Sequence, residues 1–181
     1  MTQFHSNTQR LIDYWRSLGR AGGPPRRAAV DPAHFSNLAP QTFVLGRAGA
    51  GLYPVRLAGG FVSDLHGRDL RGQNGLSLFR ERDRFTLQTA LETARRRPEP
   101  VVATVQAHAE NGAAVALEVL FAPLAGDPDR FLGLYQPLSL VARLDGLPVR
   151  ELAIGAVRGV GPANEETPRL TLATLDGRRV A

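Results

Sequence analysis

Side chains that could do chemistry are few in this sequence and lie far apart. The four histidines, His5, His34, His66 and His108, never take the i, i+4 spacing that puts two imidazoles on one helix face around a metal ion. The chain has no cysteine, so it has no thiolate nucleophile, no cysteine-bound zinc and no flavin–cysteine adduct. The sequence therefore predicts no metal site.

The candidate nucleophile Ser77 also lacks its usual surroundings. The run Gly75-Leu76-Ser77-Leu78-Phe79 has no second glycine and so does not form a nucleophile elbow. Gly49 and Gly51 do not extend to a dinucleotide-binding fingerprint, because Pro54 stands where the third glycine would be. Carboxylates are dispersed and mostly neighbour arginines, as in solvated surface pairs. We expect no catalytic residues and no enzyme.

Composition favours a globular protein without a membrane span. Of the 181 residues, 43% are hydrophobic and 22% are charged, which excludes a wholly disordered chain and fits one domain with appendages. No apolar run approaches the roughly 18 residues of a membrane span. The first residues lack the charge and the apolar stretch of a secretory signal. We expect a cytoplasmic protein.

Positive charge is concentrated near the N-terminus. All 22 basic residues are arginine, and residues 1–30 hold five of them against one acidic residue, whereas residues 31–138 hold 11 of each. A protein that tracks phosphates usually carries a continuous basic stripe with interleaved aromatics, and aromatics make up only 7% here. Nucleic acid is therefore not the expected partner. A nucleic-acid-associated protein that uses the arginine-rich arm stays open as an alternative.

The arm begins with a predicted amphipathic helix over residues 6–18. Leu11, Trp15 and Leu18 follow at i, i+4 and i+7, and Ile12 beside them completes one apolar stripe. A Gly/Pro/Arg linker follows over residues 19–30. Because the stripe holds the only tryptophan, it must pack on the rest of the chain or on a second copy. These four residues are the candidate interface, and we expect a homodimer through them.

The remaining patterns predict an α+β fold. Asp31-Pro32 indicates a helix start, and a longer helix is predicted over residues 83–95. The run Arg95-Arg96-Arg97 fits a cationic helix end better than an anion site. Strand patterns cover residues 42–45, 53–58, 101–108, 115–123 and 131–138. Because strands lie on both sides of a helical middle, we expect a five-stranded antiparallel sheet with helices on one face.

Several short motifs stand in this order of elements. They are Tyr14-Trp15, Asp31-Pro32, Leu38-Ala39-Pro40, residues 53–59, residues 67–72, residues 118–124 and Gly133. In order and spacing they resemble a bacterial, alphaproteobacterial family of small stand-alone PAS proteins over about residues 8–138. The resemblance implies a PAS domain at 31–138, between the N-terminal arm (1–30) and a C-terminal extension of unknown role (139–181). It also implies a non-catalytic regulatory module that signals through protein–protein contacts.

The resemblance implies a cavity between the sheet and its helices, lined by the apolar residues of both. A close-packed core is favoured over a ligand pocket, and no cofactor is predicted. The alternative function is a sensor of haem or another small ligand, anchored by His66 or another histidine. The candidate cavity residues are Phe43, Val55, Leu57, Phe61, His66, Phe79, Leu91, Val105, Leu117, Val119 and Leu134.

One residue departs from the family pattern. An aromatic or apolar residue usually precedes the Gly67-Arg68 motif, and here that residue is His66. Pointing inward, His66 would place a titratable ring at the cavity edge, but a half-exposed histidine in a loop is favoured. In the extension, residues 152–154 are apolar, and residues 170–173 resemble a strand that could join a sheet edge or exchange with another subunit.

Overall fold

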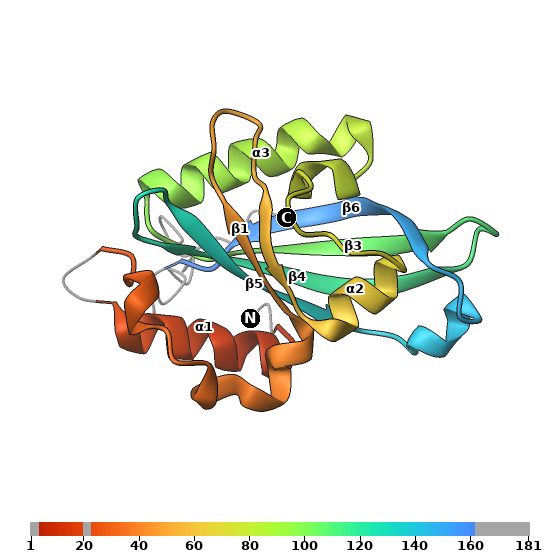
Figure 1. The fold of residues 1–181 in the computed structure, drawn as a ribbon, viewed down its shortest axis with the longest axis horizontal. Helices are drawn as coiled ribbons and strands as arrows, with labels where there is room; N and C mark the ends of the chain where they lie inside the picture. Colours follow the sequence, from red (N-terminus) through yellow and green to blue (C-terminus); the bar gives the residue numbers. More distant parts are fainter. Residues whose placement is uncertain (1–3, 20–22, 162–181) are drawn as a thin grey trace, which may run out of the picture.

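The structure is a computed structural model that describes residues 4–19 and 23–161. An antiparallel sheet of six strands, in the order β2-β1-β5-β4-β3-β6, forms its centre (Figure 1). The strands are β1 (Thr42–Gly46), β2 (Val55–Ala58), β3 (Val101–Ala109), β4 (Ala114–Leu124), β5 (Arg130–Pro137) and β6 (Val149–Gly159). The helices are α1 (Ser6–Leu18), α2 (Gly60–His66) and α3 (Glu81–Arg96), with short 3-10 segments η1 (Arg27–Ala29), η2 (Pro32–Gln41), η3 (Gly75–Leu78) and η4 (Val141–Leu144).

The extension contributes the sixth strand, which corrects the predicted number of five. β6 contains the apolar residues 152–154 and pairs with β3 along its whole length, from Val101 opposite Gly159 to Ala109 opposite Val149. β3 would otherwise be an edge strand with unpaired backbone groups. The strand-like residues 170–173 lie outside the described residues. The edge strands of the described sheet are β2 and β6.

Helices cover both faces of the sheet, whereas the sequence predicted one covered face. α3 and η3 pack on one face, and α1 packs with η2 on the other, as Figure 1 shows. The reason lies in β4 and β5, whose successive residues are buried on both faces. A strand covered on both sides is apolar nearly throughout. Among the described residues, no helix is both long and apolar enough to cross a membrane.

α1 packs on the sheet face opposite α3, through apolar residues in its middle and a hydrogen bond at its beginning. Leu11 and Ile12 are fully buried, and the Trp15 indole Nε1 donates to the Pro123 carbonyl at 2.7 Å. At the beginning of the helix, the His5 amide donates to the Glu118 carboxylate at 3.0 Å. The predicted stripe is therefore confirmed as a packing face, and it packs on the sheet of its own chain.

Candidate functional site

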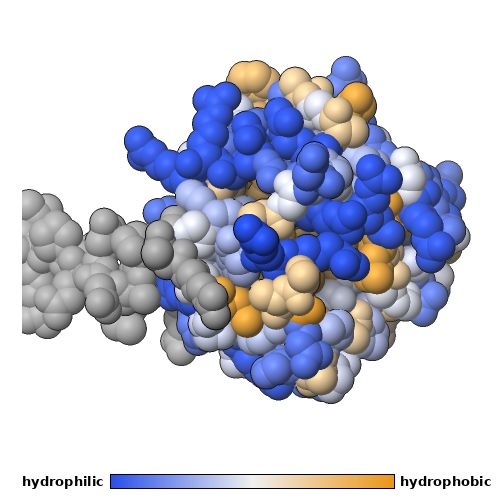
Figure 2. All heavy atoms as spheres, turned by 60° about the vertical axis from the view of Figure 1, so that its left-hand side comes forward, coloured by the Kyte–Doolittle hydropathy of each residue, from blue (hydrophilic) through white to orange (hydrophobic). Residues whose placement is uncertain are grey.

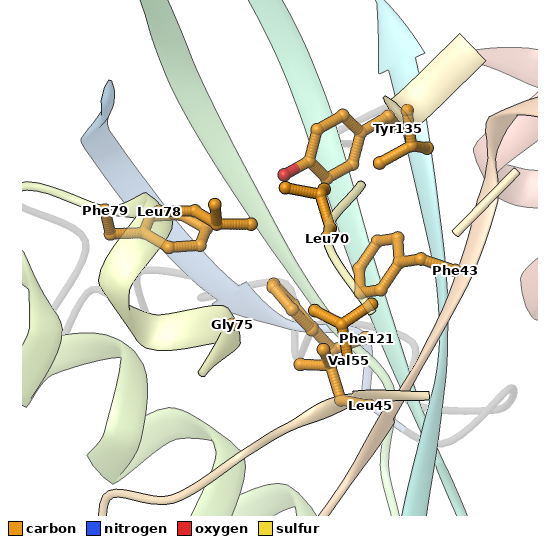
Figure 3. Close-up of a pocket in the computed structure, with 10 residues that line it drawn as sticks. Phe43, Leu45, Val55, Leu70, Gly75, Leu78, Phe79, Phe121 and Tyr135 are labelled. Carbon is orange, nitrogen blue, oxygen red and sulfur yellow. The ribbon is translucent and has the colours of Figure 1, made fainter. Parts of the chain in front are cut away.

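A small internal cavity lies between the sheet and the segment from α2 to η3. Its volume is about 20 Å³, which is room for about one water molecule. Side chains from β1, β2, β4, β5, α2 and η3 converge on it (Figure 3). The lining residues are Phe43, Leu45, Val55, Val62, Leu70, Gly75, Leu78, Phe79, Phe121 and Tyr135. Tyr135 is the one lining residue with a polar side-chain group, and the surface of the cavity itself is apolar.

Three of the eleven candidate cavity residues, Phe43, Val55 and Phe79, line this cavity. Four others (Leu91, Val105, Leu117 and Val119) belong to the same buried core without lining the cavity, and Phe61 packs against that core half-buried. The core around the cavity is therefore larger than the cavity lining. The sequence did not single out the six side chains Leu45, Val62, Leu70, Leu78, Phe121 and Tyr135.

Leu57 and Leu134 were assigned to the wrong face of the sheet. Leu57 is 46% exposed, because a bulge shifts the register so that Val55 faces Leu45 while Leu57 faces Val44. Leu134 belongs to the core under α1. β5 is apolar on both faces, so alternation alone could not tell which of its residues point to the cavity.

His66 is buried, with 2% of its surface exposed, so the favoured expectation of a half-exposed loop residue is wrong. It is the last residue of α2, and its ring meets the Tyr135 ring at a centroid distance of 5.9 Å. The His66 Nε2 and the Tyr135 hydroxyl lie 3.3 Å apart. The His66 Nδ1 is buried without a hydrogen bond of good geometry among the described residues, although the Val149 backbone lies close enough to the ring to act on its pKa. The two side chains form the one polar pair beside an otherwise apolar cavity.

Burial lowers the pKa of His66 from its usual 6.5 to about 4, because the cationic ring would lose its water. The unfolded chain binds this proton at a higher pH than the folded chain does, so stability falls as the pH drops from 6.5 toward 4. We expect the free energy of unfolding of wild type to fall between about pH 7.5 and about pH 5. This fall should be about 2 kcal/mol larger than the fall in His66→Leu over the same range. Urea titrations at several pH values measure this difference.

The control for this titration is His34→Gln, since His34 is exposed on η2. This variant should keep the wild-type dependence of stability on pH. An equal dependence in wild type and His66→Leu would contradict a buried, neutral His66.

A second polar cluster ties the end of α3 to the β1–β2 loop. Glu92 accepts from the Arg47 Nε at 2.7 Å, from the Tyr53 hydroxyl and from Arg95 at 3.2 Å. Burial alone would raise the pKa of Glu92, but these three hydrogen bonds outweigh it and lower the pKa to about 2. Arg95 also lies 3.5 Å from Asp129. These side chains bond to one another, so the cluster has a structural role.

A haem does not fit the cavity as it stands. Cofactor sites usually enclose roughly 300 to 1,000 Å³, against about 20 Å³ here. The one histidine beside the cavity, His66, already contacts Tyr135. In the part of the chain that the structure describes, no three metal-ligating side chains come together. The cavity has room for a very small molecule at most.

An antiparallel sheet that forms one wall of a small internal cavity, with short helices as the opposite wall, is the architecture of a PAS domain. The family model for the PAS domain matches residues 3–136, and the chain belongs to this family. No curated protein matches the sequence. The match ends one residue before the end of β5, so β6 lies beyond it.

Solved structures of light-oxygen-voltage (LOV) proteins are distantly similar. The Rhodobacter sphaeroides LOV protein is 16% identical with a TM-score of 0.46, over 64% of this chain and 72% of that chain. The blue-light photoreceptor Aureochrome1 LOV is 11% identical with a TM-score of 0.47, over 69% and 92%. An RNA-binding light-oxygen-voltage receptor is 16% identical with a TM-score of 0.45, over 71% and 40%.

Proposed function

We propose that this PAS domain is a non-catalytic regulatory module that signals through protein–protein contacts, with β6 as the output. The observation that supports this proposal is the position of Phe79. Its side chain lines the cavity, and its backbone forms a parallel bridge with Leu152 in β6. One residue thus belongs both to the cavity wall and to the contact with the added strand.

Three further contacts reinforce this connection between η3, α3 and β6. The Arg80 amide donates to the Leu152 carbonyl at 2.9 Å, and the Arg80 Nε lies 2.7 Å from Glu151. The Ile154 amide donates to the Asp83 carboxylate at 2.9 Å. These bonds join the first half of β6 to the start of α3. β6 is therefore held between β3 and the cavity wall.

The proposed signal is a change of packing at the cavity. A molecule that entered a space of about 20 Å³ would displace the side chains around it, because protein interiors are close-packed. A displacement of Phe79 would strain its bridge to Leu152, and β6 would loosen or shift along β3. The exposed face of β6 would then present a changed surface to a partner.

Phe79→Ala tests this coupling by hydrogen exchange. We expect amides of residues 149–154 to exchange at least about tenfold faster than in wild type, because the lost ring leaves the bridge unsupported. The matched control is Leu38→Ala, a buried residue of η2 under the opposite face of the sheet. This control should leave the exchange of β6 unchanged relative to β3.

The same two variants test the output. Affinity capture from the host with wild type, Phe79→Ala and Leu38→Ala should show a partner that wild type and Leu38→Ala retain and Phe79→Ala loses. Equal protection of β6 in both variants, or a partner that all three retain, would contradict the proposed route.

A homodimer through α1 stays a prediction. Leu11, Ile12 and Trp15 are buried against the sheet of the same chain, and Leu18 is half-buried. A dimer that uses this stripe would require α1 to leave its own sheet or to dock on the sheet of a second copy.

The second candidate function is a sensor of a small ligand. The buried, unpartnered His66 Nδ1 and the nearby Tyr135 hydroxyl favour it, because a ligand with one polar group could satisfy the orphaned nitrogen. Native mass spectrometry and an absorbance scan of freshly purified protein would show a retained ligand. Its retention by wild type and loss from His66→Leu is the expected result for this candidate.

A further inference from the structure

One end of the sheet gathers arginines that have no acidic partner among the described residues. This basic end comprises Arg26, Arg27, Arg96, Arg97, Arg130 and Arg158. None of the six lies within 4.0 Å of a carboxylate of residues 4–19 or 23–161. Figure 2 turns this end toward the viewer and shows hydrophilic residues over most of it.

Strand pairing places three of these arginines at the same end. Arg130 begins β5 and lies opposite Leu124, the last residue of β4. Arg26 forms a parallel bridge with Ala125, so the N-terminal arm meets the β4–β5 turn there. Arg26, Arg27 and Arg130 line one open hollow together with Asp127.

The other three arginines reach this end from α3 and β6. Arg95 lies 3.5 Å from Asp129 in the β4–β5 turn, so the next two residues, Arg96 and Arg97, lie beside that turn. Arg158 is close to the end of β6 and pairs with Val102, near the beginning of β3. The six positive charges therefore come from four segments that are far apart in the sequence.

Few negative charges oppose them. Glu92 and Asp129 are engaged by Arg47 and Arg95. At this end of the described chain, Glu99 and Asp127 are the carboxylates without an ion pair. Six cations against two anions leave a strong excess of positive charge, and such an excess attracts a polyanion. The arm contributes two of these six arginines, and the C-terminal end of α3, β5 and β6 contribute the other four.

The side chains exposed at the basic end indicate which kind of polyanion it binds. Among the described residues, the exposed large apolar side chains are Leu52, Leu57, Phe85, Leu138, Leu140 and Leu147. Only Leu52 is near the basic end, because it belongs to the β1–β2 loop, whose Arg47 amide donates to the Asp129 carbonyl in the β4–β5 turn. The described part of the basic end therefore has no exposed aromatic ring on which single-stranded bases could stack, and one leucine is too little apolar surface for insertion into a membrane. We propose that the basic end binds the phosphate backbone of a nucleic-acid duplex, without reading its sequence.

Fluorescence anisotropy with a labelled DNA duplex of about 20 base pairs tests this proposal across about 50 to 200 mM salt. Binding by the full chain should weaken steeply with salt. The triple variant R26Q/R96Q/R130Q should bind at least about tenfold more weakly at low salt. Its log–log salt slope should be shallower by about 2 to 3, since each phosphate contact contributes about 0.9.

The matched control is R68Q/R71Q/R143Q, which removes three exposed arginines that also have no acidic partner among the described residues. This control should bind as wild type does, apart from the small effect of net charge. An equal loss in both variants would overturn the proposal, and so would an absence of binding at low salt. Tighter binding to anionic lipid vesicles or to a single strand than to the duplex would overturn it as well.

Discussion

Replacement of Trp15 by alanine is expected to lower the free energy of unfolding by about 3 to 5 kcal/mol. Trp15 is 7% exposed and lies at the centre of the contact between α1 and the sheet. Its removal leaves a large cavity and an unpaired Pro123 carbonyl, to which the indole donates at 2.7 Å. Urea unfolding followed by circular dichroism measures the loss.

Trp15→Phe separates the packing of the ring from its hydrogen bond. The phenyl ring keeps most of the apolar contact but cannot donate to Pro123, so we expect a loss of about 1 to 2 kcal/mol. A loss below about 1 kcal/mol for Trp15→Ala would mean that α1 is not docked on the sheet in solution. α1 would then be free for the predicted homodimer.

Gly133→Ala is expected to destabilise the domain by about 3 kcal/mol through overpacking. The Phe43 ring lies directly over Gly133, so a methyl group there would overlap the ring. The ring cannot move aside easily, because it packs edge-on against Phe121 at 5.6 Å and against Tyr135 at 5.3 Å. Chemical denaturation of the variant, compared with wild type, gives the value.

Two further variants make this prediction specific. Gly60→Ala at the start of α2 meets open space and should be neutral or slightly stabilising. In the double variant Gly133→Ala/Phe43→Ala, the ring that causes the overlap is gone. The double variant should therefore be more stable than the sum of the single losses predicts, by at least about 2 kcal/mol. Simple additivity would contradict the proposed contact.

The family resemblance implied a cavity between the sheet and its helices, whereas the residues themselves favoured a close-packed core, and the space in the structure is only about 20 Å³. Phe43, Val55 and Phe79 line it as expected. Leu70 lies in a loop without periodicity, so no pattern could identify it. The family pattern, with an apolar residue usually at this position, was a sign that His66 could be buried, but the polar residue type favoured exposure, and the structure buries it.

The sequence also did not indicate the role of the C-terminal extension. Residues 152–154 were recognised as apolar, but their partner strand β3 lies more than 40 residues earlier in the chain. Pairing over such a distance depends on which edge of the sheet is open. Only the folded arrangement identifies β6 as the neighbour of both β3 and Phe79.

Local patterns were enough to determine the kinds of element, their order and the apolar stripe of α1, because each depends on residues within a few positions of one another. The faces of β2 and β5 and the gathering of the basic end depend instead on register, twist and contacts between distant segments. A bulge of one residue moves Leu57 outward, and one turn brings Arg26 beside Arg130. Only the tertiary structure determines these features, because a local sequence pattern does not specify which distant segment will lie next to it.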